Sequence, residues 1–161
     1  MDLKQHQLDS QRVKKENVKF FKQLQKVKPK VLDKYIHRIH EETFSCIDCL
    51  QCANCCSTTG PLFTDKDISR IAKYLSIKPS DFTEQFLHID EDNDYVLQSV
   101  PCTFLDADNQ CSIYHVRPKA CREYPHTNRI KQHQLLKLTE KNVSICPAVF
   151  QIVEKLKNQL K

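Results

Sequence analysis

The stretch from Phe44 to Pro61 reads FSCIDCLQCANCCSTTGP and holds five of the nine cysteines of the chain. Four of them recur at every third position and a fifth follows at once: Cys46, Cys49, Cys52, Cys55 and Cys56. Cysteine thiolates are soft ligands that suit zinc, copper(I) or iron–sulfur clusters. Two residues between cysteines let both sulfurs face one metal while the backbone makes a tight loop. The stretch therefore predicts one half of a metal or cluster site, whose other ligands come from elsewhere in the chain.

The cysteines are expected to be reduced thiols of an intracellular protein. The first residues, MDLKQHQLDSQRVKKEN, lack the apolar segment of a signal peptide. The number of cysteines is odd, and the neighbours Cys55 and Cys56 have poor geometry for a mutual disulfide. No segment approaches the roughly 20 apolar residues of a membrane-spanning helix. We therefore expect a cytoplasmic protein without a membrane span.

The chain has only one glycine, Gly60, and this count excludes several functions. P-loops and dinucleotide-binding turns need two or three glycines where the backbone approaches phosphate. The sequence therefore has no nucleotide-binding motif, and a Rossmann-type methyltransferase is disfavoured. A length of 161 residues is that of one domain.

Basic residues gather at the two ends of the chain. Residues 1–40 carry 11 Lys and Arg against 4 Asp and Glu, and residues 111–161 carry 10 against 3. Residues 41–110 reverse the balance, with 4 against 13. This pattern is typical of solvated helices, and no basic stripe with interleaved aromatic residues indicates nucleic-acid binding. We do not expect a nucleic-acid partner, although binding through the basic ends is kept as an alternative, and the partner is left unknown.

Apolar residues recur with a helical period over most of the chain. Helices are predicted over residues 3–27, 30–42, 65–75 and 79–87, from Pro118, and after Cys146-Pro147, where the helix is strongly amphipathic. Thr64 and Asp67 fit a capping box at the third of these helices. His37 and His40 lie three apart beside an apolar stripe and are expected to be structural. Residues 126–141 are polar and predict a loop or a weak strand.

Short strands are predicted near the middle of the chain, at residues 95–98, 101–105 and 111–114. The turn at residues 106–110 joins the last two into a hairpin that presents Cys102 and Cys111. The acidic run Asp90–Asp94 lacks the glycine and closing Glu of a calcium loop and predicts a solvated hairpin tip. The expected fold class is mainly α: a small single domain with a short β-hairpin, built around a cysteine-ligated metal or cluster site.

The four later cysteines lie beside residues that fix the backbone. Their neighbours are a proline, a turn, a helix start and a second proline, for Cys102, Cys111, Cys121 and Cys146 respectively. Rigid carriers suit a ligand scaffold, because less conformational entropy is lost when the metal binds.

These motifs together resemble the YkgJ-type cysteine-cluster family, the zinc- or iron-chelating CxxCxxCC domain. The matching residues are Cys49-x2-Cys52-x2-Cys55-Cys56, Pro101-Cys102-Thr103-Phe104-Leu105, Cys111-Ser112-Ile113-Tyr114, Arg117-Pro118-x2-Cys121-Arg122-x-Tyr124-Pro125 and Cys146. The resemblance implies eight metal ligands: Cys49, Cys52, Cys55, Cys56, Cys102, Cys111, Cys121 and Cys146. The resemblance covers about residues 44–150. With the helices predicted at both ends, we expect three segments: N-terminal helices over 1–43, the cysteine-cluster domain over 44–150, and a C-terminal helix over 146–161 that packs on it.

The identity of the metal stays open at this point. Eight thiolates suit two tetrahedral zinc ions, one four-cysteine iron–sulfur cluster with further thiols, or two clusters. The spacing Cys46-x2-Cys49-x2-Cys52-x3-Cys56 is that of a bacterial ferredoxin, but Ser57 replaces the proline expected next. Cys46 lies outside the family pattern and is kept as an accessory metal ligand.

Two arginines and a tyrosine are predicted to surround the ligands. Arg117 and Arg122 bracket Cys121 and are expected to donate hydrogen bonds to thiolates or nearby carbonyls, which offsets the negative charge of a thiolate site. Tyr124 is placed with them as a packed aromatic residue whose hydroxyl reaches the surface. His115 and His126 are alternative ligands that eight cysteines make unnecessary.

Two classes of function remain from the sequence. The first is a metal-binding protein in which zinc or an iron–sulfur cluster holds the fold of a binding or structural module. The second is an iron–sulfur enzyme with redox or group-transfer activity, because flagellin lysine-N-methylases carry a similar domain. The sequence has no Ser/His/Asp or Cys/His arrangement typical of catalysis, so the first class is favoured and the question of an enzyme is left open.

Overall fold

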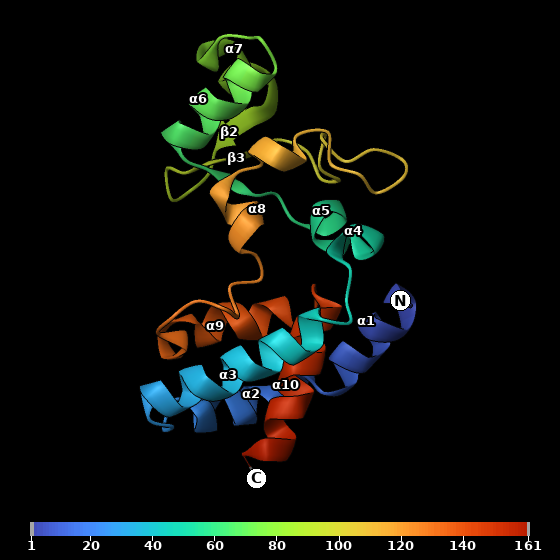
Figure 1. The fold of residues 1–161 in the computed structure, drawn as a ribbon, viewed down its shortest axis with the longest axis vertical. Helices are drawn as coiled ribbons and strands as arrows, with labels where there is room; N and C mark the ends of the chain where they lie inside the picture. Colours follow the sequence, from blue (N-terminus) through green and yellow to red (C-terminus); the bar gives the residue numbers. More distant parts are fainter. Residues whose placement is uncertain (1, 161) are drawn as a thin grey trace. The chain divides into compact units, whose positions relative to one another are not determined.

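The computed structural model describes residues 2–160 and is mainly α-helical, with a small antiparallel sheet (Figure 1). The predicted fold class is therefore confirmed. The elements in chain order are α1 (Leu3–Arg12), α2 (Lys14–Leu24), α3 (Pro29–Phe44), α4 (Cys49–Cys52), α5 (Asn54–Thr58), β1 (Leu62–Phe63), α6 (Asp65–Tyr74), α7 (Pro79–Phe86), β2 (Leu87–Ile89), β3 (Tyr95–Leu97), the 3-10 helix η1 (Tyr114–Val116), α8 (Lys119–Glu123), α9 (Gln132–Asn142) and α10 (Pro147–Gln159).

The elements form two compact units, and each is described by itself. Unit 1 contains the chain up to Cys49 together with the chain from Pro125 onward. Unit 2 contains Leu50–Tyr124. None of the helices within residues 2–160 is long and apolar enough to cross a membrane.

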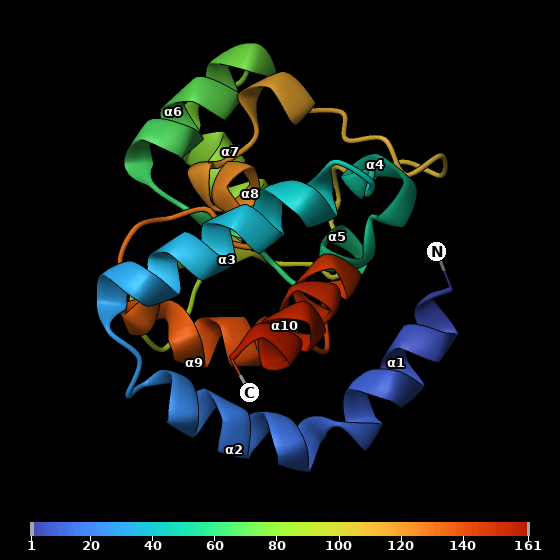
Figure 2. The same ribbon diagram turned by 60° about the horizontal axis from the view of Figure 1, so that its bottom comes forward.

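Unit 1 is a helical bundle in which α3 packs against both α9 and α10 (Figure 2). The helices bury apolar stripes that recur every three or four residues, as an amphipathic helix does when it covers a core. Helix α2 packs on α9, and α1 packs on α10. The buried residues are Phe20, Phe21, Leu24, Leu32, Ile36, Ile39, Leu136, Val143, Val149, Ile152, Val153 and Leu156.

The first predicted helix is divided at Val13 into α1 and α2. The two halves bury different kinds of side chain: α1 buries His6 and Ser10, whereas α2 buries Asn17 and three apolar residues. A single straight helix would not keep both faces on the core, since α1 and α2 contact different helices.

Two histidines of α3 hold the loop that precedes α9. The Nε2 atom of His37 lies 2.7 Å from the carbonyl oxygen of Arg129, and Nδ1 of His40 lies 2.7 Å from Oγ1 of Thr127. Burial lowers the pKa of His40 below its ordinary value, so the neutral ring is favoured at neutral pH. These contacts give both histidines the structural role that the sequence predicts.

Helix α9 is the main departure from the predicted secondary structure. The polar run was expected to be a loop or weak strand, but Gln132–Asn142 is helical. The start of the helix is stabilised from outside: the carboxylate of Asp33 accepts hydrogen bonds from the amides of Lys131 (2.9 Å) and Gln132 (2.8 Å). This carboxylate replaces a local N-cap, since Lys131 makes no side-chain cap bond of its own.

Unit 2 places α6 and α7 against a three-stranded sheet of order β1-β3-β2. Both strand pairs are antiparallel, with Leu62 opposite Val96 and Leu87 opposite Leu97. The core is rich in aromatic rings, and the rings of Phe82 and Phe104 stack at 6.1 Å between centroids. The buried residues are Phe63, Ile68, Ile71, Ala72, Phe82, Leu87, Leu97, Phe104 and Ile113.

Several local predictions in unit 2 are confirmed. Helix α6 begins at the predicted capping box, in which Thr64 and Asp67 each bond the other's backbone amide. The acidic run Asp90–Asp94 forms the turn between β2 and β3. The hairpin predicted over residues 101–114 is much reduced, because only one β-bridge, Leu105–Cys111, joins its two sides.

Replacing Asp33 by alanine should remove the cap of α9. We expect the free energy of unfolding in urea to fall by about 1 kcal/mol, the usual cost of losing an N-cap side chain. Lys34→Ala is the control: Lys34 is exposed on the same helix, and its loss should change the stability by about 0.5 kcal/mol or less. Equal stabilities of the two variants would contradict the role given to Asp33.

Candidate metal centre

Cys56 is carried by α5, one of two helical turns that replace the predicted tight loop. Helices α4 and α5 are separated by Ala53, whose backbone is left-handed (φ 44°). The hydroxyls that follow Cys56 bind back to this short helix, since Ser57 and Thr58 donate to the carbonyls four residues earlier. A single turn of helix thereby holds Cys56 in a fixed direction.

The segment that carries Cys102 and Cys111 is tied to α5 and to the core. The amide of Cys102 donates to the carbonyl of Cys56 at 2.8 Å. Between the two cysteines, Phe104 is buried in the aromatic core, and its carbonyl accepts from the amide of Ser112 at 2.9 Å. Cys102 and Cys111 themselves pack against this core.

The turn between these cysteines is closed by Asp106. Its carboxylate accepts from the amides of Asp108 (3.0 Å) and Gln110 (2.7 Å). Asn109 takes the left-handed backbone that the turn requires (φ 60°). Asparagine tolerates this conformation better than most residues, which matters in a chain with one glycine.

Cys121 lies on α8, whose first amide is held from α6. The buried carboxylate of Asp67 accepts a hydrogen bond from the amide of Lys119 at 3.1 Å. Arg70, also on α6, donates to the carbonyls of Val116 and Arg117, at 3.2 and 3.0 Å. The turn before α8 is therefore fixed to α6.

Within unit 2, four thiols lie close enough for each to influence the others. Burial first, and then the thiols of Cys56, Cys102 and Cys111, raise the pKa of Cys121 to about 12. The pKa values of Cys102 and Cys111 are also raised, by burial and then in part by neighbouring thiols. All six pairs among the four cysteines contribute to these shifts, so the four sulfurs form one group, which we call the four-thiol group.

Cys56 is the member of the four-thiol group that ionises most readily. Its Sγ atom lies 4.0 Å from that of Cys55. A hydrogen bond from Cys55 stabilises the thiolate and lowers the pKa of Cys56 to about 7, despite burial. Cys56 is therefore the thiolate that faces the three neighbours with raised pKa values.

Arg117 supplies positive charge to the four-thiol group. Its guanidinium lowers the pKa values of Cys111 and Cys121, in opposition to burial. The same group donates to the carbonyl of Tyr114 at 2.6 Å and lies over the Tyr114 ring at 3.9 Å, so its position is fixed. Its influence on the thiols is electrostatic in this structure.

The four thiols are neighbours, but their sulfurs are not arranged around a common metal position. No group of three or more His, Cys, Asp or Glu side chains within residues 2–160 has the geometry to hold a metal ion as it stands. The chemistry of the donor set nevertheless fits zinc or iron, because four thiolates are the ligands of many tetrahedral zinc and iron sites.

The other predicted metal ligands lie partly in unit 2 and partly in unit 1. Cys52 and Cys55 belong to unit 2 and are half-buried. Cys49 and Cys146 belong to unit 1, where Cys146 packs against the core. Cys46, the accessory candidate, is exposed after the end of α3, with its sulfur 3.5 Å from Oγ of Ser45. These residues remain predictions as ligands.

Arg122 and Tyr124, which were predicted to surround the metal ligands, differ in exposure. Arg122 is exposed on α8. Tyr124 follows α8, and its hydroxyl oxygen is buried, so the expectation that this hydroxyl reaches the surface is wrong. Asp67 and Arg70 were not predicted to support the site. The only sequence signal for Asp67 is its capping box, and Arg70 has no local signal.

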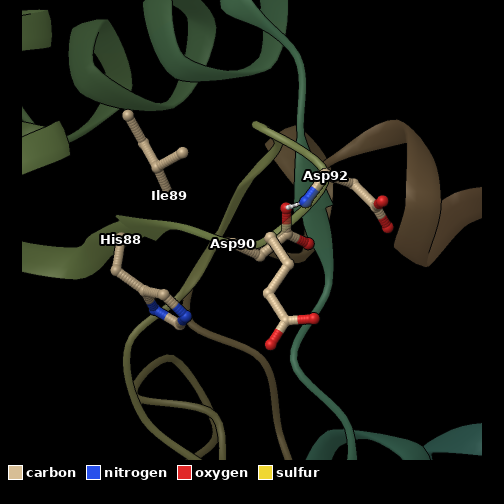
Figure 3. A pocket seen from close by; sticks show the side chains of 5 residues that line it. His88, Ile89, Asp90 and Asp92 are labelled. Carbon is tan, nitrogen blue, oxygen red and sulfur yellow. Dashed lines mark hydrogen bonds between the residues drawn. The ribbon is translucent and has the colours of Figure 1, made fainter.

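A shallow hollow lies at the acidic turn of unit 2 and is lined by residues 88–92 (Figure 3). One carboxylate oxygen of Asp90 accepts from the amides of Asp92 and Asp94, both at 3.0 Å. This oxygen therefore binds backbone amides of its own turn, in agreement with the prediction of a hairpin tip.

The pKa values predict how the thiols react in metal-free, reduced protein. Only thiolates attack iodoacetamide, so Cys56 should be alkylated at pH 7, where about half of it is ionised, and Cys121 should resist. At pH 6 the thiolate fraction of Cys56 falls to about one tenth, and its rate should fall with it. Peptide mass spectrometry measures each site. Alkylation of Cys121 as fast as Cys56 would contradict the arrangement.

The thiol-rich part of the chain is similar to known proteins. Residues 48–147 match the CxxCxxCC family model, described as "Putative zinc- or iron-chelating domain". A Methanocaldococcus jannaschii protein, "Uncharacterized protein MJ0661", is 34% identical over 92 residues, which are 54% of this chain and 48% of that protein. This chain thus spans about half the length of that relative. No solved structure matches the chain. The family model covers more than half of the sequence, and the chain belongs to the CxxCxxCC family of zinc- or iron-chelating domains.

Proposed function

We propose that unit 2 binds one zinc or iron centre through the thiolates of Cys56, Cys102, Cys111 and Cys121. The observation that carries the proposal is the four-thiol group itself, in which every pair of sulfurs interacts. The family supports metal chelation in general, and the choice of these four ligands is our own step.

The backbone supports the grouping independently of charge. Cys56 and Cys102 are joined by a hydrogen bond of 2.8 Å, and a β-bridge joins Leu105 to Cys111. The amide of Tyr114 then bonds the carbonyl of Cys111 at 3.0 Å, at the start of the turn that leads to Cys121. The four ligands therefore come from segments that are already connected.

Closing the site needs a rearrangement of the four side chains, since they do not hold a metal ion as they stand. Zinc–sulfur bonds of about 2.3 Å in a tetrahedron place the sulfurs about 3.8 Å apart. We expect rotation of the four side chains to bring their sulfurs to tetrahedral spacing.

The charges favour a cation at this place. Four thiolates in a half-buried group repel one another, and this repulsion contributes to the raised pKa values of Cys102, Cys111 and Cys121. A divalent metal stabilises all four thiolates and leaves a formal charge of about −2. The guanidinium of Arg117 offsets part of this remaining charge.

The role we propose for the centre is to hold the fold of a binding module. When bound, the metal supplies cross-links between segments that span Cys56 to Cys121. Structural zinc contributes about 10–16 kcal/mol in zinc-finger peptides, which is comparable with the whole stability of a domain, about 5–15 kcal/mol. We expect unit 2 to depend on it more than unit 1, which has a large apolar core of its own.

The ligand set also includes the four remaining family cysteines in our proposal, as the family pattern implies. They are Cys49, Cys52, Cys55 and Cys146. Cys46 is left outside the set, because it does not belong to the family pattern.

The decisive experiment is anaerobic purification followed by metal and sulfide analysis and a visible spectrum. Iron with sulfide and a brown colour would indicate a cluster, whereas a colourless protein with zinc would indicate a structural zinc site. Cys111→Ser should lose one metal per chain and expose unit 2 to faster proteolysis within residues 50–124.

Cys46→Ser is the matched control and should keep the full metal content. Three results would contradict the proposal: wild-type protein without stoichiometric zinc or iron, Cys111→Ser with unchanged metal content, or an equal loss in both variants.

A further inference from the structure

We propose that Asp67 and Arg70 form a positioning pair that sets the affinity of the four-thiol group for metal by fixing the turn between Cys111 and Cys121. The inference rests on the proposed function, since it concerns the same metal site. Neither residue is a proposed metal ligand.

The pair joins a buried carboxylate to a partly exposed guanidinium. Nη2 of Arg70 lies 2.6 Å from Oδ1 of Asp67, and the Asp67 side chain is only 2% exposed. The other carboxylate oxygen accepts from the amide of Thr64 at 3.0 Å and from its hydroxyl at 2.7 Å. A buried carboxylate needs such partners, because burial without them is costly.

Asp67 and Arg70 also form hydrogen bonds with the backbone of residues 116–119. Arg70 donates through Nε and Nη2 to the carbonyl of Val116, both at 3.2 Å, and through Nη2 to that of Arg117 at 3.0 Å. Asp67 accepts from the amide of Lys119 at 3.1 Å. The guanidinium of Arg70 thus binds carbonyls of this short turn, and the carboxylate of Asp67 binds an amide of the same turn.

The turn is the only stretch of chain between the third and fourth ligands. The amide of Tyr114 bonds the carbonyl of Cys111, and the amide of Cys121 bonds that of Pro118, both at 3.0 Å. Each end of the turn is therefore linked directly to a ligand residue. A shift of the turn would move Cys121 relative to Cys111.

The alternative reading is that the capping box needs Asp67 and that Arg70 only neutralises it. A capping box is complete with Thr64 and Asp67, and it does not require contacts 46 to 52 residues away. The guanidinium makes its carbonyl bonds to the turn in addition to its ion pair. Asp67 and Arg70 therefore fix the backbone of the turn from two sides of its peptide groups, through an amide and two carbonyls.

The test measures metal affinity and the geometry of the metal site in full-length variants. Arg70→Lys keeps the charge but loses the planar fork, and Asp67→Asn keeps the shape but loses the carboxylate. Affinity is measured by competition with a chromophoric chelator for zinc, and geometry is measured from the visible absorption of Co²⁺-loaded protein. Both variants should lose 10- to 100-fold in affinity, as is typical when partners outside the ligand shell are removed, and should shift the Co²⁺ bands.

Ile71→Val is the matched control. Ile71 is buried on the same helix and makes a core contact only, so its truncation destabilises α6 without altering the bonds to the turn. Its zinc affinity should stay within about threefold of wild type and its Co²⁺ spectrum should be unchanged. Lys73→Met, at an exposed position of α6, should behave as wild type.

The inference is overturned if Arg70→Lys and Asp67→Asn bind zinc as wild type does, or if Ile71→Val loses as much affinity as they do. If Asp67→Asn does not fold, Arg70→Lys alone decides between these outcomes. A wild-type protein that binds no metal would instead contradict the proposed function.

Discussion

The burial of four thiols beside one another is the constraint on which unit 2 depends. Burial and neighbouring thiols together raise the pKa values of three of these cysteines, and the largest shift is at Cys121. Without a cation, the protein must keep most of these thiols protonated. With a divalent metal, the same crowding becomes favourable, because every thiolate gains an attractive partner. The family's chelating character has a direct physical basis in this arrangement.

The fold of unit 2 is arranged so that each segment carrying one of the four thiols is held by other contacts. Ser57 and Thr58 bind the carbonyls of the short helix that carries Cys56, and Phe104 anchors the segment of Cys102 and Cys111 in the aromatic core. Helix α6 holds the turn before Cys121. Preorganised carriers of this kind reduce the conformational entropy lost when a metal binds.

Features with local signals in the sequence were predicted well. The capping box of α6 and the acidic hairpin tip depend on residues within a few positions, and both are present. Helix α9 was missed because its cap, Asp33, lies 99 residues from Gln132 in the sequence. The support given by Arg70 to the turn was missed for the same reason, since the contact spans 47 residues.

Which cysteines belong to the four-thiol group could also not be predicted from the sequence. Regular spacing at Cys49, Cys52, Cys55 and Cys56 fits several registers, so spacing does not say which sulfur joins the later ligands. The fold favours Cys56, because its carbonyl accepts from the amide of Cys102 and its thiol raises the pKa values of the other three members of the four-thiol group.

The most direct test is X-ray absorption on a variant that keeps only the four-thiol group. In this protein the other five cysteines, Cys46, Cys49, Cys52, Cys55 and Cys146, are replaced by serine. We expect one zinc or iron per chain, with a first shell of four sulfurs at about 2.3 Å. A variant that binds no metal, or a shell containing nitrogen or oxygen, would contradict the claim that Cys56, Cys102, Cys111 and Cys121 form one metal site.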